Sequence, residues 1–344
     1  MTYKRWTLYY FTIPLVTITA IFTFNFIIDP YSMTKYNLLE IPNKFARDDR
    51  VEKVVKLKSS PAFDNIVLGS SRVYSSNPLM VSKYLGGSTY NAGVGTARVE
   101  DDLGFILLLQ RLNKLPKNII IGLDFYSFNE ELETNKYFLK NEDLNFLKKG
   151  LSQKSYLANF LSLDALRASY KTLSNFIKHP EAKPRFDKNG ASHNASQIFS
   201  LEPSKEDKNK KEFSAKEIQQ ELQFVKTINY TQISQKRLEY LQRIVTIAKE
   251  NNIKLYLYIT PLYGELLSKI QEDTALSKQL ELFKESIKEM HPLYTFTQHN
   301  SIIDAREYFN NPTHMTPVGN NLLYVKIFND KNISLPENFG EYLK

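Results

Sequence analysis

The first segment of this 344-residue chain whose residue types could do covalent chemistry is a serine-containing turn at residues 69–72, Gly-Ser-Ser-Arg. It follows residues 65–68, whose apolar, partly β-branched sequence predicts a short buried strand. A serine held on a sharp turn after a strand exposes its hydroxyl in the way that nucleophilic catalysis requires. Glycine and serine also favour ordinary turns. The turn alone therefore leaves both a nucleophile and a simple loop open.

Three later segments place further polar groups at strand ends or in loops near them. The glycine-containing segment 93–95 follows a predicted short strand, and Asp124 ends a longer apolar one. His314 comes late in the chain, three residues after Asn311. The carboxyl ends of parallel strands meet at one sheet edge, where open α/β folds bind their ligands. We therefore expect these groups to gather at that edge.

The elements around these segments predict an α/β fold. An amphipathic helix over about residues 99–113 lies between two predicted strands, and this order implies a parallel sheet with a right-handed crossover. Residues 130–232 are rich in Lys, Asn, Glu and Ser, and we interpret them as a helical insertion or lid. The other expected elements are a helix at about 48–58, a helix at 235–250, a strand at 253–259, a helix at about 277–290 and a short last helix after residue 320.

The amino-terminal residues predict a membrane anchor. Residues 7–28 carry no charge, are mostly apolar and exceed the roughly 20 residues that a helix needs to cross a bilayer. Lys4 and Arg5 precede the run. A cleaved secretory signal is the alternative, but no small-residue cleavage site follows. We therefore predict a single-pass anchor in the cytoplasmic (inner) membrane, with residues 1–6 inside and the chain from Asp29 onward periplasmic or otherwise extracytoplasmic.

Composition restricts the other classes of function. The hydrophobic fraction of 42% and the charged fraction of 24% fit an ordinary globular protein. The chain has no cysteine and its 5 histidines are scattered, so neither a disulfide nor a metal site is predicted. Segment 93–98 is only a partial dinucleotide fingerprint, because Arg98 stands at the third glycine position, and no cofactor is expected. The net charge of +8 suits an anionic surface or a solvated basic face, and nucleic acid is not predicted as a partner.

In their order and spacing, the four polar segments resemble the motifs of the SGNH/GDSL hydrolase superfamily. The anchor followed by Asp29-Pro30-Tyr31, and the strand that ends in Thr260-Pro261, are similar to a membrane-anchored envelope branch of it. That branch includes the alginate O-acetylation accessory proteins and the lipoteichoic-acid D-alanylation protein. The resemblance covers about residues 60–130 and 250–325. It implies a three-layer α/β sandwich with a mainly parallel, flavodoxin-like sheet, in which a connector at 29–59 leads to an SGNH-like domain at 60–344.

The resemblance also assigns roles to individual residues. The family pattern Gly-x-Ser makes Ser71 the nucleophile, with Ser70 as the alternative, and His314 the general base. The backbone N–H groups of Ser71 and of Gly93 or Gly95 are implied as the oxyanion hole.

Two residues depart from the family pattern. Asp124 stands where the family has an oxyanion-binding asparagine followed by aspartate, and Asn311 stands where the family has the aspartate that orients the histidine. We hypothesise that Asp124, or failing that Asp304, supplies the acid that orients His314. The alternative is a decayed site in a binding or scaffolding protein.

The function that the resemblance implies is that of an extracytoplasmic serine esterase or acyltransferase. Its substrate would be acyl groups, in particular O-acetyl groups, on a cell-envelope polysaccharide. Arg72 and Ser70 adjoin the nucleophile and are expected to contact substrate. Arg72 could hold a carboxylate or phosphate of an anionic glycan, or only pair with a surface acid. The alternative function is a carbohydrate-binding or accessory scaffold for a membrane-bound acyltransferase.

Overall fold

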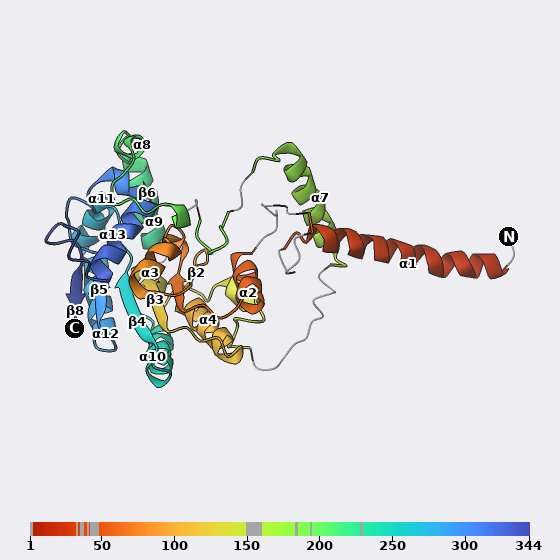
Figure 1. The fold of residues 1–344 in the computed structure, drawn as a ribbon, viewed down its shortest axis with the longest axis horizontal. Helices are drawn as coiled ribbons and strands as arrows, with labels where there is room; N and C mark the ends of the chain where they lie inside the picture. The colour runs from red at the N-terminus through yellow and green to blue at the C-terminus, as the bar shows by residue number, and fades with distance from the viewer. Residues whose placement is uncertain are drawn as a thin grey trace. The chain divides into compact units, whose positions relative to one another are not determined.

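A six-stranded, mainly parallel sheet organises the fold, in the strand order β2-β1-β3-β4-β5-β8 (Figure 1). The order of its first five strands is that of flavodoxin-like doubly wound sheets. The predicted α/β class with a mainly parallel sheet is therefore confirmed. The strands are β1 (Asn65–Gly69), β2 (Thr89–Asn91), β3 (Asn118–Leu123), β4 (Lys254–Ile259), β5 (Leu293–Thr295) and the antiparallel edge strand β8 (Glu341–Leu343). The computed structural model describes residues 3–31, 34, 38–39, 41, 48–148, 160–182, 185–192, 195–227 and 230–344.

The two central strands owe their place to their apolar sequences. Every residue of β1 and β3 is buried, as expected of strands covered on both faces of a parallel sheet. Their register pairs Val67 with Ile120 and ends with Gly69 opposite Gly122. Both strands therefore stop at the same edge of the sheet.

Helices cover both faces of this sheet. Right-handed crossovers place the helix between β1 and β2 on one face, and the helices between β2 and β3 and between β3 and β4 on the other. The helices are α3 (Pro78–Leu85), α4 (Val99–Arg111), α10 (Gln235–Glu250), α11 (Gly264–Glu272), α12 (Thr274–Lys288) and α13 (Pro317–Ile327). Contacts of α4 with α10, and of α3 with α13, agree with these two layers. Helices α4, α10, α12 and α13 correspond to helices expected from the sequence, whereas α3 and α11 were not predicted.

The sheet and its helices belong to one compact unit, which comprises Pro61–Asn145 and Phe186–Lys344. The predicted insertion at 130–232 is therefore divided between two compact units. Its residues 146–185 belong to a second unit, and the rest belong to the unit of the sheet. Helix α9 of the insertion packs against α11 and is part of the sheet-bearing unit. The remaining elements of this unit are η1 (Ser71–Val73), η2 (Phe125–Phe128), α5 (Lys136–Lys140), η3 (Ala195–Gln197), α8 (Lys205–Lys208), α9 (Ala215–Thr227), η4 (Arg306–Tyr308), β6 (Phe309–Asn311) and β7 (His314–Met315).

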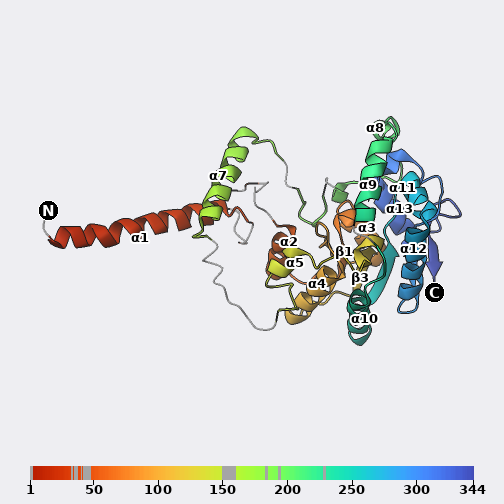
Figure 2. The same cartoon turned by 180° about the vertical axis from the view of Figure 1, so that it is seen from behind.

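The second unit comprises Met1–Ser60 and Phe146–Arg185. It contains α1 (Tyr3–Ile28), α2 (Asp49–Ser59) and α7 (Leu163–Lys178). Helix α1 is long and apolar enough to cross a membrane, and most of it is exposed, so the predicted apolar helix is confirmed (Figure 2). Helix α2 begins after the cap residue Asp48, close to where a helix was predicted. The rest of the predicted connector at 29–59 lies largely outside the described residues.

Candidate active site

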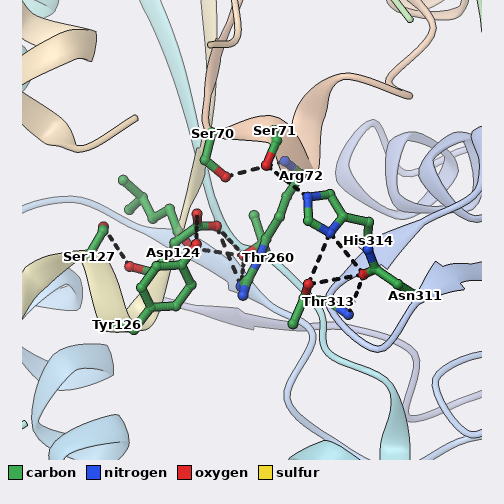
Figure 3. Close-up of polar contacts among 11 residues, drawn as sticks. Ser70, Ser71, Arg72, Asp124, Tyr126, Ser127, Thr260, Asn311, Thr313 and His314 are labelled. Carbon is green, nitrogen blue, oxygen red and sulfur yellow. Dashed lines mark hydrogen bonds and ion pairs between the residues drawn. The ribbon is translucent and has the colours of Figure 1, made fainter. Parts of the chain in front are cut away.

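The serine turn at the end of β1 exposes one serine and buries the other. Gly69 ends the strand, and the chain enters η1 at Ser71. The Ser70 hydroxyl oxygen accepts a hydrogen bond from the N–H of Arg72 at 3.2 Å. Ser70 is only 2% exposed. Ser71 is half-buried and projects into the site (Figure 3). Ser70 is therefore a capping residue, and its predicted role in substrate contact is wrong.

Close packing explains the glycines of the three motifs. Gly69 has φ +134°, a conformation that favours glycine, and a Cβ added there would lie 2.7 Å from the Gly122 carbonyl oxygen. A Cβ added to Gly93 would lie 2.3 Å from a methyl group of Val73, and one on Gly122 would lie 2.8 Å from the other methyl group. Only glycine at these positions lets the serine turn sit directly on the ends of the strands.

The structure brings together two residues that lie far apart in sequence. The Ser71 Oγ is 2.8 Å from the Nε2 of His314. His314 opens β7, which pairs with β6 so that Asn311 and His314 face each other across a two-residue turn. The hairpin thus explains the spacing of the late motif, because residues on either side of such a turn lie side by side.

Hydrogen bonds within the hairpin determine which imidazole nitrogen carries the proton. The N–H of Thr313 donates to the Asn311 Oδ1 at 3.0 Å, so the amide atom at that position must be oxygen. The same oxygen is 2.9 Å from the His314 Nδ1, which must therefore donate to it. The Thr313 hydroxyl is 2.9 Å from Nδ1 and donates to Oδ1. This tautomer leaves a lone pair on Nε2 facing the serine hydroxyl, as a general base requires.

Asp124 does not orient the histidine. Its carboxylate accepts hydrogen bonds from the hydroxyls of Thr260 at 2.7 Å and Tyr126 at 3.1 Å, and lies 3.5 Å from the Arg72 guanidinium. Within the described residues, no hydrogen bond joins Asp124 to His314. The hypothesis that Asp124 supplies the orienting acid is therefore wrong.

Asp304, the second candidate for that acid, belongs to another cluster. Its carboxylate is 2.6 Å from the Nδ1 of His299, whose Nε2 is 3.1 Å from the Ser268 hydroxyl. The hypothesis on Asp304 is therefore wrong too. Ser268 lies within α11, where backbone N–H groups bond to carbonyls of the helix and not to a developing oxyanion. This second serine–histidine pair offers an internal control for the first.

Arg72 is buried beneath the serine turn. Its side chain is 6% exposed, donates to the Thr260 hydroxyl at 3.0 Å and lies 4.6 Å from the centre of the Tyr126 ring. Burial and the nearby Asp124 charge raise the pKa of Tyr126, so its hydroxyl remains a donor to that carboxylate at neutral pH. The expected contact of Arg72 with an anionic substrate is therefore wrong. The alternative, pairing with a surface acid, is right about the ion pair but wrong about its place, because Asp124 is buried.

The backbone donors at this edge are only partly available. Ser71 begins a 3₁₀ turn, where N–H groups lack helical acceptors, and no acceptor for its N–H lies among the described residues. The Gly93 N–H already donates to the Asn91 Oδ1 at 3.0 Å, which contradicts its predicted role. The Asn91 amide also donates to the Val73 carbonyl at 2.6 Å and so ties the two motif loops together. The role of Gly95, which is half-buried, stays a prediction.

A further carboxyl group lies behind the site. Asp102 on α4 is buried and bonds to the backbone of Gly69. Burial, followed by the charges of Asp101, Asp124 and Glu100, raises the pKa of the Asp102 carboxyl well above its usual range. Asp102 therefore keeps its proton to higher pH than an ordinary aspartate.

Sequence reasoning missed several of these contacts. Thr313 could have been found, because Asn-Pro-Thr is typical of a turn in which the asparagine oxygen accepts the N–H two residues later. Thr260 and Asn91 could have been singled out as polar residues that end or follow strands. Nothing in the sequence indicated that Asp102 on α4 approaches Gly69.

No protein-family model and no curated protein matches this chain. Among the described residues, no group of three or more His, Cys, Asp or Glu side chains is placed to hold a metal ion.

Proposed function

We propose that this chain is a membrane-anchored serine esterase or O-acyltransferase of the SGNH type. The observation that carries the proposal is the hydrogen-bonded series Ser71–His314–Asn311 at the carboxyl edge of a parallel sheet. In the first step, the Ser71 oxygen attacks an ester carbonyl while its proton passes to the His314 Nε2. Collapse of the tetrahedral intermediate releases the alcohol, which takes that proton, and leaves an acyl-serine. Water or a second hydroxyl then accepts the acyl group by the reverse series of transfers.

Asn311 supports this chemistry by position and not by charge. In one serine protease, replacing the triad aspartate by asparagine lowers turnover by about 10⁴ because the imidazole adopts the wrong tautomer. Here the N–H of Thr313 holds the asparagine oxygen toward Nδ1 and preserves the productive tautomer. The base is therefore formed correctly, although the imidazolium lacks the stabilisation that a carboxylate would provide.

The proposed location follows from α1. Its length, its apolar surface and the basic residues Lys4 and Arg5 favour a single-pass anchor in the cytoplasmic membrane with the site outside. Acyl groups, in particular O-acetyl groups, on a cell-envelope polysaccharide are the substrate class that fits this placement and the family resemblance. Because Arg72 is enclosed, we assign it no role in selecting an anionic polymer.

A second function is favoured by the two departures from the family pattern. Asp124 replaces an oxyanion donor and is committed to Arg72, Thr260 and Tyr126, and Asn311 contributes no charge. A catalytically impaired protein with this site would serve as a carbohydrate-binding or accessory scaffold for a membrane acyltransferase. Such a protein would keep its polymer binding when Ser71 is replaced.

Activity-based labelling separates the two functions. The full chain in detergent is treated with a fluorophosphonate probe and a chromogenic acetyl ester, beside Ser71→Ala and His314→Ala. Ser70→Ala and Ser268→Ala serve as controls, since Ser268 also contacts a histidine. The enzyme proposal expects labelling and turnover to be lost in the first two variants and kept in the controls. Activity that persists in Ser71→Ala contradicts it, and an inert, well-folded wild type favours the scaffold.

A further inference from the structure

Helix α7 carries an apolar stripe on its exposed surface. Apolar residues recur on it at intervals of three and four, the spacing that gathers side chains on one helical face. Leu163, Tyr170 and Ile177 are 68%, 70% and 70% exposed. The full stripe consists of Leu163, Leu166, Tyr170, Leu173 and Ile177.

A different face of α7 packs in the interior of its unit, so the stripe is not the face that folding buries. The buried residues of the helix are small: Ala165, Ala168, Ser169 and Thr172. Small side chains at this spacing let two helices approach closely, and α7 contacts α1. Exposure of the apolar stripe therefore needs an explanation other than core packing.

The contact with α1 lies at the carboxyl end of that helix. Asn25 is fully buried and donates to the Phe160 carbonyl at 2.7 Å, and the Phe160 ring meets Phe22 and Phe26 edge-on. Upstream of these residues α1 is almost entirely exposed. Both views show α7 crossing the end of α1 at a steep angle (Figures 1 and 2). A helix that crosses the end of a membrane-spanning helix in this way runs along the membrane surface.

The charges of α7 suit the same environment. Three basic residues, Arg167, Lys171 and Lys178, lie beside the apolar stripe, against one acidic residue, Asp164. Basic side chains flanking a Leu, Ile and Tyr face are typical of helices that lie in the interface of an anionic bilayer. Tyr170 adds a ring with a polar tip, which favours the headgroup level.

We infer that α7 is an interfacial helix, whose apolar stripe enters the outer surface of the bilayer that α1 crosses. The inference rests on the proposed membrane anchor, and it is independent of the chemistry of Ser71. It makes α7 (Leu163–Lys178) a second membrane contact. The chain would thus be held at the membrane by two elements that lie far apart in its sequence.

Depth-dependent fluorescence quenching tests this inference on the full chain in vesicles of phosphatidylethanolamine and phosphatidylglycerol. Trp6 is the single tryptophan, so Trp6→Phe gives a silent background for Tyr170→Trp. Asn175→Trp is the matched control, because it is exposed on the same helix and points away from the stripe. An interfacial helix sits about 5–10 Å into the boundary between headgroups and acyl chains. Lipids brominated near the headgroup should therefore quench Tyr170→Trp several times more strongly than lipids brominated at the chain end.

The expected result is strong shallow quenching at Tyr170→Trp and little at Asn175→Trp. Equal quenching by aqueous iodide at both positions would overturn the inference, because both side chains would then face water. A blue-shifted emission of Tyr170→Trp without lipid quenching would also overturn it, since the stripe would then be covered by protein. The wild-type chain, in which Trp6 is the single tryptophan, tests the anchor separately. If brominated lipids do not quench Trp6 in the wild type, the anchor fails; if they quench Trp6 but not Tyr170→Trp, only the inference on α7 fails.

Discussion

The N–H of Thr313 donates to the Asn311 side-chain oxygen at 3.0 Å, and this contact determines which ring nitrogen of the neutral His314 imidazole carries the proton. With its oxygen fixed toward the ring, Asn311 can only accept from the His314 Nδ1. The Nε2 lone pair then faces Ser71. An asparagine at this position, in place of an aspartate, therefore retains the geometry of a general base at His314.

Restoring the carboxylate should increase turnover. A hydrogen bond to a charged group is worth about 1.5–3 kcal/mol, against about 0.5–1.5 kcal/mol for a neutral one. The difference of about 1.4 kcal/mol corresponds to roughly a tenfold rate. We expect Asn311→Asp to raise kcat on an acetyl ester by about this factor, and Asn311→Ala to lower it. A lower kcat in a well-folded Asn311→Asp variant would show that the asparagine is not acting as the orienting residue.

Replacing one partner of the buried pair Arg72–Asp124 should destabilise the fold more than replacing both. Removing one partner of a buried ion pair leaves the other uncompensated, at a cost of about 3–5 kcal/mol. We expect Arg72→Met to lower the free energy of unfolding by that amount in chemical denaturation. The double variant Arg72→Met/Asp124→Asn should recover most of the loss, because neither partner is left as an uncompensated buried charge. Additive losses in the double variant would argue against the pair.

Stability should depend on the protonation of Asp102. Its raised pKa means that the folded chain binds more protons than the unfolded chain above the ordinary aspartate pKa of about 3.9. The stability that this group contributes is present at low pH and is lost as pH rises, by up to about 1.4 kcal/mol per pH unit until the folded pKa is reached. Asp102→Asn imitates the protonated form, so its advantage over the wild type in denaturation should grow as the pH rises from about 3.9 to the raised pKa of the folded state. A constant difference across this range would contradict the prediction.

The glycine next to the serine turn should not tolerate a methyl group. A Cβ at Gly93 would lie 2.3 Å from Val73, and overpacking of this kind costs about 1–3 kcal/mol. We expect Gly93→Ala to lose stability and also activity, since Val73 belongs to the turn that carries Ser71. Gly86→Ala is the control: its φ of +72° strains the backbone, but nothing lies within 4 Å of the added carbon. Gly86→Ala should therefore lose stability and keep activity.

The sequence predicted the sheet better than the details of the site. The short apolar runs that became β1 and β3 predicted strands buried on both faces of a parallel sheet, and every residue of both strands is buried. The pairing of Ser71 with His314 was an implication of the family resemblance, and the two side chains do meet. The partner of His314 was predicted wrongly, because a hairpin turn places Asn311 beside the ring and sequence cannot show where the Asp124 carboxylate points.

The sequence also did not show which polar groups of the site are buried or already hydrogen-bonded. Arg72 adjoins the nucleophile and so was expected to face substrate, yet its side chain turns inward to Thr260 and Asp124. The Gly93 N–H was an expected donor, but Asn91 accepts it through a side chain whose rotamer no pattern predicts. These are tertiary contacts between segments that meet only in the folded chain.

Identification of the labelled residue tests the central claim most directly. The full chain is treated with the fluorophosphonate probe, digested, and the modified peptide is sequenced by mass spectrometry. The account predicts a phosphonyl adduct on Ser71 that is absent in His314→Ala and present in Ser268→Ala. An adduct on Ser70 or Ser268, or an adduct on Ser71 that forms equally fast without His314, would contradict it.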